Sequence, residues 1–81
     1  MHVRVRLGAG LARLAAAPLV SLELDEGATV ADAYRRLAAE QPQLAAALGA
    51  ALPVVSGVHA DREHPLHAGD ELALLTPVAG G

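Results

Sequence analysis

The chain has 81 residues, a formal net charge of −3 and no cysteine. This length fits one small domain with a modest core, and the missing cysteine excludes disulfides and thiolate chemistry from within the chain. The six basic residues are all arginine and too scattered to form a nucleic-acid-binding stripe. The longest apolar stretch, 44–55, contains Pro53 and is shorter than the ~20 residues that cross a bilayer, so we expect a cytoplasmic protein without membrane contact.

Two segments near the N-terminus alternate between apolar and polar residues and therefore predict half-buried strands. The first covers residues 2–7 and the second residues 19–25. The segment 8–18 between them is longer than a tight hairpin turn, and the spacing of its leucines indicates one helical turn.

A helix is predicted to begin at about Val30. Thr29 stands three residues before Asp32, so Thr29 can cap this helix while Asp32 favours its positive end. Apolar residues then recur every three or four positions and predict one buried stripe: Val30, Ala33, Tyr34, Leu37 and Ala38. Pro42 suits the first turn of a second short helix, predicted over 41–48.

The last third of the chain predicts an edge hairpin over 52–60 and a final strand over 71–76. A long helical connection after a hairpin favours a final strand that returns beside the first and parallel to it. We therefore expect an α+β roll, a mixed sheet of about four to five strands covered on one face by helix. This domain would span residues 1–76, with an extended tail over 77–81.

The body of the chain offers no pattern that predicts a site. The turn 8–10 follows a strand, but the third glycine of a dinucleotide fingerprint would fall at Arg13. His64 and His67 could share a metal only if aligned, and Pro65 argues against the helix that would align them. The acidic residues near them have no histidine or serine spaced for acid–base catalysis. We expect no bound metal, no bound cofactor and no enzyme activity by the chain alone.

The uncharged ending 77–81, Pro77-Val78-Ala79-Gly80-Gly81, is the remaining candidate. Glycine has no Cβ, so this ending can enter a slot only a backbone wide. An α-carboxyl has a pKa near 3.5, so it is ionised at neutral pH and can attack the α-phosphate of ATP held by a partner enzyme. The resulting acyl adenylate would let a sulfur nucleophile from another protein convert Gly81 to a thiocarboxylate.

Four segments resemble one known family. The ending 74–81, preceded by Pro65-Leu66 and by Gly69-Asp70-Glu71-Leu72, resembles the small subunit of molybdopterin synthase, a ubiquitin-like β-grasp sulfur carrier. Residues 26–30, Glu-Gly-Ala-Thr-Val, resemble the start of that family's helix. The chain departs from the family at Leu7-Gly8, Ser56-Gly57 and Thr76-Pro77, where the family often has two aromatics, Asn-Gly and Pro-Pro.

The resemblance implies a β-grasp fold and three protein partners. A ubiquitin-activating-like adenylyltransferase would use ATP to activate the tail, and a sulfurtransferase would supply sulfur. The synthase large subunit, in a heterotetramer, would then accept the tail and pass its sulfur to a pterin precursor of the molybdenum cofactor. The resemblance makes Gly81 the sulfur carrier and Gly80 the thin approach, with Leu75 and Val78 as the apolar docking surface.

Two alternatives stay open from the sequence. Carriers for thiamine synthesis and for tRNA thiolation share the grasp fold and the Gly-Gly ending, and some related carriers also modify proteins. A β-grasp interaction module whose final glycines are incidental is the alternative from another class.

Overall fold

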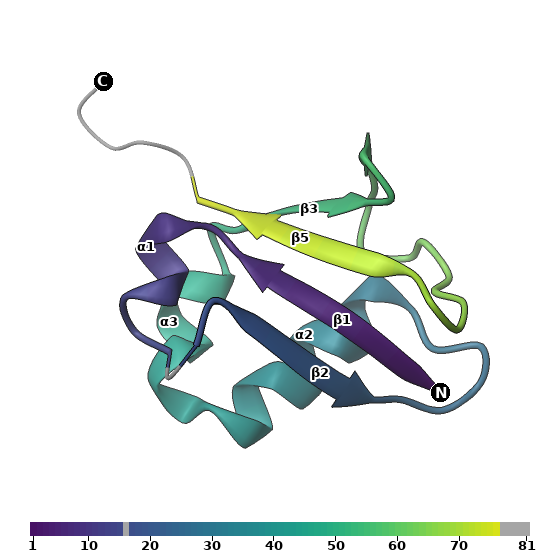
Figure 1. Ribbon diagram of the computed structural model, residues 1–81, viewed down its shortest axis with the longest axis horizontal. Coiled ribbons are helices and arrows are strands. Elements are labelled where there is room, and N and C mark those ends of the chain that lie inside the picture. The colour runs from purple at the N-terminus through teal and green to yellow at the C-terminus, as the bar shows by residue number, and fades with distance from the viewer. Residues whose placement is uncertain (16, 77–81) are drawn as a thin grey trace.

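The computed structural model describes residues 1–15 and 17–76. All strands of this part of the chain belong to one mixed sheet. Figure 1 shows the strands on one side of the molecule and the helices α2 and α3 on the other. The elements in chain order are β1 (His2–Leu7), α1 (Ala9–Ala12), β2 (Leu19–Glu23), α2 (Val30–Glu40), a 3-10 turn (Pro42–Leu44), α3 (Ala45–Leu48), β3 (Leu52–Val55), β4 (Val58–His59) and β5 (Glu71–Leu75).

The sheet has five strands among the described residues, in the order β2-β1-β5-β3-β4. β1 and β5 run parallel, with Arg4 opposite Glu71 and Leu7 opposite Leu74, while the other pairs are antiparallel. The last strand therefore returns beside the first, as the long helical connection predicts. The α+β roll expected from the sequence is confirmed, including the edge hairpin of β3 and β4.

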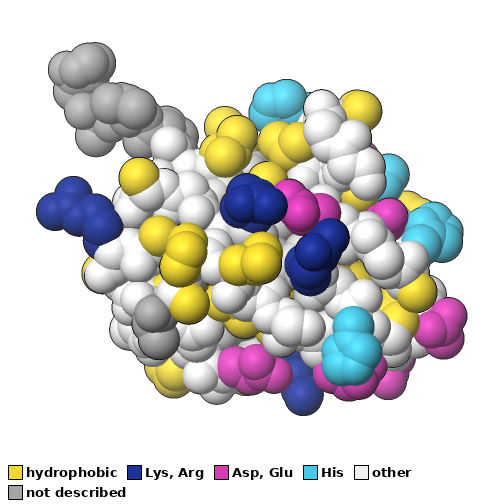
Figure 2. All heavy atoms as spheres, in the orientation of Figure 1, with side chains coloured by type: hydrophobic (Ala, Val, Ile, Leu, Met, Phe, Trp, Pro, Cys, Tyr) yellow, Lys and Arg dark blue, Asp and Glu magenta, His cyan; other side chains and the backbone are white. Residues whose placement is uncertain are grey.

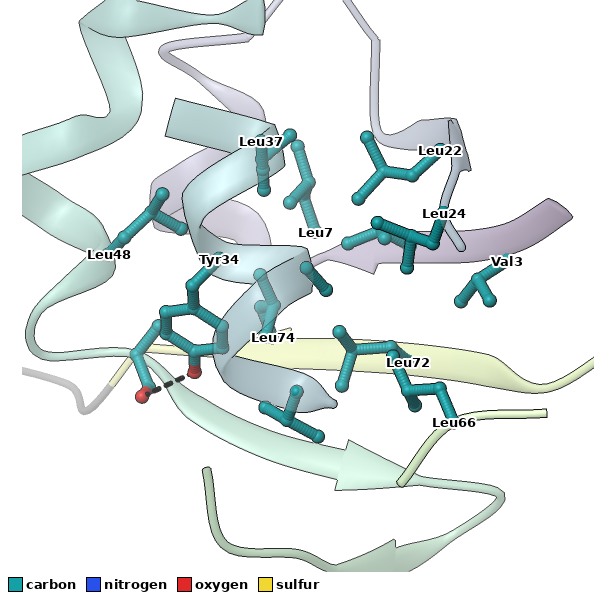
Figure 3. Close-up of a cluster of buried hydrophobic side chains, with 14 of the residues drawn as sticks. Val3, Leu7, Leu22, Leu24, Tyr34, Leu37, Leu48, Leu66, Leu72 and Leu74 are labelled. Atoms are coloured by element: carbon teal, nitrogen blue, oxygen red, sulfur yellow. Dashed lines mark hydrogen bonds between the residues drawn. The ribbon is translucent and has the colours of Figure 1, made fainter. Parts of the chain in front are cut away.

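The core lies between the sheet and α2, on the face that the strand alternation predicts (Figure 3). Val3 and Val5 of β1 are fully buried, while Arg4 between them and Arg6 after them point away. Tyr34 is 5% exposed, and its hydroxyl donates a hydrogen bond of 2.9 Å to the carbonyl oxygen of Ala51. The largest fully buried side chains are Leu11, Leu22, Leu37, Leu44, Leu66, Leu72, Leu74, Val3, Val5 and Val30.

The start of α2 is fixed by side-chain and backbone contacts. The Asp32 amide donates to the Thr29 hydroxyl at 3.4 Å, and the Thr29 amide donates to the Asp32 carboxylate at 2.9 Å, so the predicted cap is confirmed. The first two amides of the helix, those of Val30 and Ala31, donate to the carbonyls of His64 and Arg62 in the loop between β4 and β5, at 3.0 and 2.8 Å. The helix N-terminus is thus fully occupied by the chain itself.

Several predicted boundaries were wrong. The second strand ends at Glu23 rather than at residue 25, because its partner β1 begins at His2, which lies opposite Glu23. The short helix over 41–48 is a 3-10 turn followed by α3, and the last strand ends at Leu75 rather than at residue 76. The helical turn after β1 does form, and it buries Leu11 completely.

No helix in the described ranges is both long enough and apolar enough to span a membrane.

Candidate site at the end of the last strand

The candidate site begins where β5 ends. β5 is held between two neighbours, because Leu74 lies opposite Leu7 of β1 on one side, and Leu75 lies opposite Leu52 of β3 on the other. Gly8, the residue after β1, donates its amide hydrogen to the Leu74 carbonyl at 2.8 Å. The point from which the chain leaves the sheet is therefore fixed by backbone contacts on both sides. The predicted site residues Pro77, Val78, Ala79, Gly80 and Gly81 lie outside the described residues.

The sheet face opposite the helices carries an apolar surface next to this point. Leu75 is 44% exposed and its cross-strand partner Leu52 is 45% exposed. Leu19 of β2 is 42% exposed on the same face. We call the following residues the open-face patch: Leu19, Leu52, Val54, Ala73 and Leu75. Figure 2 shows apolar side chains on this face together with basic and acidic ones. The predicted docking residue Leu75 thus lies in a patch of several apolar residues.

An ion pair crosses the open face between β1 and β5. The Arg6 guanidinium donates from Nε to the Glu71 carboxylate at 2.8 Å and from Nη2 at 3.4 Å, and Arg4 lies 4.0 Å from the same carboxylate. This hydrogen bond and the charge of Arg6 lower the pKa of Glu71, while the same pairing raises the pKa of Arg6. One carboxylate thus faces two guanidinium groups, so this region of the open face is locally positive in a chain of net charge −3.

The backbone atoms of the two histidines considered for a metal take part in local hydrogen bonds. The His64 carbonyl accepts the Val30 amide at 3.0 Å, and the His67 amide donates to the Asp70 carboxylate at 2.8 Å within a turn. Within 1–15 and 17–76, no three His, Cys, Asp or Glu side chains are placed to hold a metal ion together. The open-face patch and the pair Arg6 and Glu71 offer apolar contact and charge for recognition.

Comparison with known proteins identifies the family. The family model described as the ThiS family matches residues 5–81. The chain belongs to the ThiS family. Membership of this family makes the chain a ubiquitin-like sulfur carrier, and its fold is the β-grasp that the resemblance implies. A comparison with curated proteins gives no match.

Solved structures share the fold of this ThiS-family protein. Small archaeal modifier protein 1 from Haloferax volcanii is 31% identical, with all of both chains covered and a TM-score of 0.92. Subunit 1 of the molybdopterin-converting factor from Helicobacter pylori, solved in a complex with subunit 2, is 24% identical over all of both chains, with a TM-score of 0.73. A putative subunit 1 from Pyrococcus furiosus is 21% identical, covers 96% of this chain and 99% of its own, and has a TM-score of 0.84. The last two show the fold.

Sequence reasoning missed most of the open-face patch of this ThiS-family protein. Leu19, Leu52 and Leu75 each place an apolar residue on the face of a strand that is otherwise polar or half-exposed. Such an exception to alternation is a usable signal for a contact surface. The sequence also shows no sign of the ion pair between Arg6 and Glu71, which the parallel register of β1 and β5 brings together.

Proposed function

We propose that this protein carries sulfur on its C-terminal Gly81, as the small subunit of molybdopterin synthase in molybdenum cofactor biosynthesis. The observation that carries the proposal is the match of the ThiS family model to residues 5–81, which includes the Gly80-Gly81 ending. The resemblance of residues 74–81 to the synthase small subunit supports the choice of pathway.

The proposed chemistry uses the tail carboxylate as a nucleophile and then as an acyl donor. A carboxylate oxygen of Gly81 attacks the α-phosphate of ATP on an adenylyltransferase, and pyrophosphate leaves. Sulfide, or an equivalent sulfur delivered by a sulfurtransferase, attacks the carbonyl carbon, and AMP leaves with the phosphate-linked oxygen. Gly81 then carries a thiocarboxylate, whose sulfur is transferred to the pterin precursor in the synthase large subunit. Gly80 has no side chain, so it lets the carboxylate reach a narrow active site.

In this proposal the folded domain is the part of the protein that partner proteins bind. The open-face patch lies at the base of the tail, because Leu75 ends β5 and Leu52 lies beside it. An apolar surface at this position supplies binding energy away from the reacting atoms, which holds the tail in the partner's active site. Arg6 and Glu71 at its border would set the orientation of docking.

Thiocarboxylate formation is the direct test of the carrier function. The purified protein is incubated with a cognate adenylyltransferase, ATP and sulfide, and its intact mass is measured. We expect one oxygen at Gly81 to be replaced by sulfur, and a variant lacking Gly81 to fold normally and gain no sulfur. An unchanged mass with a partner that activates its other substrates would refute the proposal.

The pathway needs a separate measurement. The thiocarboxylated protein is offered to a synthase large subunit with pterin precursor, and in parallel to enzymes that form thiazole or thiouridine. We expect product only with the large subunit. Product formed only in the thiazole or thiouridine reaction would support the carrier function but assign the protein to that pathway instead.

Protein modification is a second candidate, favoured by the 31% identity to small archaeal modifier protein 1 over all of both chains. The same acyl adenylate could be attacked by a lysine amine of a target protein, forming an isopeptide bond and releasing AMP. A lysine-bearing acceptor that gains the mass of the whole chain would support this function. Acceptors that stay unmodified while thiocarboxylate forms would exclude it.

A further inference from the structure

The two outer edges of the sheet differ in length. β4 forms one edge with two residues, Val58–His59, and β2 forms the other with five, Leu19–Glu23. Strands in globular proteins are usually three to ten residues long, and a two-residue strand offers too short a ladder for another strand to join. Among the described residues, β2 is therefore the edge that can accept an added strand.

The backbone groups of β2 alternate between facing β1 and facing outward. The Leu7 amide donates to the Pro18 carbonyl and the Leu24 amide donates to the Met1 carbonyl, both at 2.8 Å. Both bonds fit the antiparallel register of β1 and β2, in which hydrogen-bonded pairs alternate with non-bonded pairs. The residues of β2 whose amides and carbonyls point outward are Leu19, Ser21 and Glu23. Within 1–15 and 17–76, no backbone partner is bonded to these outward groups.

The edge of β2 lacks the features that usually block the pairing of edge strands. Natural proteins protect such edges with lysine, proline, bulges or inward-pointing charges. The register of β2 with β1 is continuous, and its inward-pointing side chains, Val20 and Leu22, are apolar. Glu23, the one charged residue, stands at the end of the strand, while Leu19 at its start is 42% exposed. An open edge of this kind is a template for another strand.

A groove of about 480 Å³ continues from the end of this edge, between the loop 23–28 and the first turns of α2. Its charged lining consists of four carboxylates and two guanidinium groups: Glu23, Asp25, Glu26, Asp32, Arg35 and Arg36. Asp32 pairs with Arg35, and Arg36 pairs with Glu40. Asp25 and Glu26 are exposed and have no guanidinium partner in the described part of the chain. The groove therefore attracts a cationic side chain.

We propose that the outer edge of β2 binds an extended segment of a partner protein, which runs antiparallel to β2 and carries lysine or arginine at its N-terminal end. The antiparallel direction places that end beside Glu23, where the groove begins. The outward amides and carbonyls of β2 would hold the segment, while Asp25 and Glu26 would select its cation. This surface goes beyond the proposed carrier function, because Ser21 and the groove lie outside the open-face patch.

A second copy of the chain is a poorer occupant of the same edge. Symmetric antiparallel pairing of two β2 strands, centred on Ser21, would place Leu19 of one copy opposite Glu23 of the other. An apolar side chain opposite a carboxylate forms none of the favourable cross-strand pairs. It would also leave Asp25 and Glu26 without a cation, since β2 contains no lysine or arginine.

The probe is the synthetic peptide Arg-Arg-Val-Thr-Val-Thr-Val, amidated at its C-terminus and titrated into the full chain. The control peptide has glutamate in place of both arginines. Hydrogen exchange of single amides is followed by NMR, and Kd is measured by calorimetry. We expect slower exchange at the outward amides of Leu19, Ser21 and Glu23, and roughly tenfold weaker binding of the control peptide, as expected for two exposed charge pairs.

Ser21→Pro tests the backbone contact directly. Proline removes the outward amide of Ser21 and spares the ladder with β1, a position that proline tolerates in edge strands. Its Kd for the arginine peptide should rise roughly fivefold, the value of one hydrogen bond, while Ser21→Ala, which keeps the amide, should bind like wild type. Melting temperatures show whether both variants fold.

A second variant leaves the backbone of β2 intact. Asp25→Asn combined with Glu26→Gln should bind the arginine peptide as weakly as wild type binds the glutamate peptide. Glu63→Gln is the matched control, because Glu63 is exposed and does not line the groove, and it should keep wild-type affinity.

Three results would overturn the inference. The first is unchanged exchange at the outward amides of β2 at millimolar peptide, and the second is equal affinity for the two peptides. Peptide-induced shifts confined to Leu52 and Leu75 would count as the first result, since the peptide would then occupy the open-face patch. The third is a dimer of the protein alone in sedimentation that Ser21→Pro dissociates, because the edge would then belong to a second copy.

Discussion

Leu74 and Leu75 are neighbours in β5 with the same side chain and opposite roles, so their alanine variants separate folding from docking. Leu74 is fully buried and Leu75 is 44% exposed. Truncating a buried leucine removes its burial energy and leaves a cavity, and costs about 2 to 5 kcal/mol. A chain of this size has a total stability of roughly 4 to 12 kcal/mol, so Leu74→Ala removes a large fraction of it.

The expected melting temperatures follow from these energies. One kcal/mol changes the melting temperature of a domain of this size by about 4 to 8 °C. Leu74→Ala should therefore melt at least about 8 °C below the wild-type protein. Leu75→Ala should melt within a few degrees of it, because nearly half of the Leu75 side chain already faces solvent.

Partner binding should show the opposite order. Leu75 lies beside Leu52 at the base of the tail, and a central apolar contact of an interface is worth about 1 to 2 kcal/mol, or roughly 5- to 30-fold in Kd. We expect Leu75→Ala to weaken binding to the adenylyltransferase by this factor, measured by calorimetry below the melting range of both variants. Folded Leu74→Ala should bind like wild type. Wild-type affinity for Leu75→Ala would refute the docking role of the open-face patch.

Three further predictions concern the body of the protein. Thr29→Ala removes the cap of α2 and should lower the free energy of unfolding by about 1 kcal/mol, measured by urea denaturation, with an unchanged value counting against the capping contact. Tyr34→Phe leaves the Ala51 carbonyl without its donor and should cost about 1 to 3 kcal/mol while sulfur transfer is retained; a loss of transfer in folded protein would assign Tyr34 a role beyond packing. Arg6 lowers the pKa of Glu71, so the ionised pair stabilises the fold above the ordinary glutamate pKa of 4.5, and this contribution is lost as pH falls below it. Urea midpoints of wild type should therefore approach those of Glu71→Gln on acidification through that range, and a constant gap would contradict the pairing.

The sequence predicts the sheet and α2 well, because both depend on local patterns. Alternation over residues 2–7 identifies the buried face of β1, and the spacing of Thr29 and Asp32 locates the start of α2. Even the parallel return of β5 follows from a general rule about crossover connections.

The parts that escaped prediction depend on contacts between distant residues. Alternation over 19–25 assigns Leu19 to a face, but nothing in the local sequence shows that Leu52 lies opposite Leu75, which requires the register of β3 and β5. The hydrogen bond between the Gly8 amide and the Leu74 carbonyl joins opposite ends of the chain, and nothing in the local sequence around either residue indicates it. The role of the tail 77–81 stays a prediction, because these residues lie outside the described part of the structure.

The position of β5 between β1 and β3 has a mechanical consequence. A partner that pulls on the C-terminus applies force along the axis of β5, and the hydrogen bonds of both ladders resist that force together, in shear. A strand at the sheet edge would instead have one ladder to hold it, and peeling from its end would break those bonds one after another. The strand from which the tail leaves the sheet is therefore anchored on both sides against such a force.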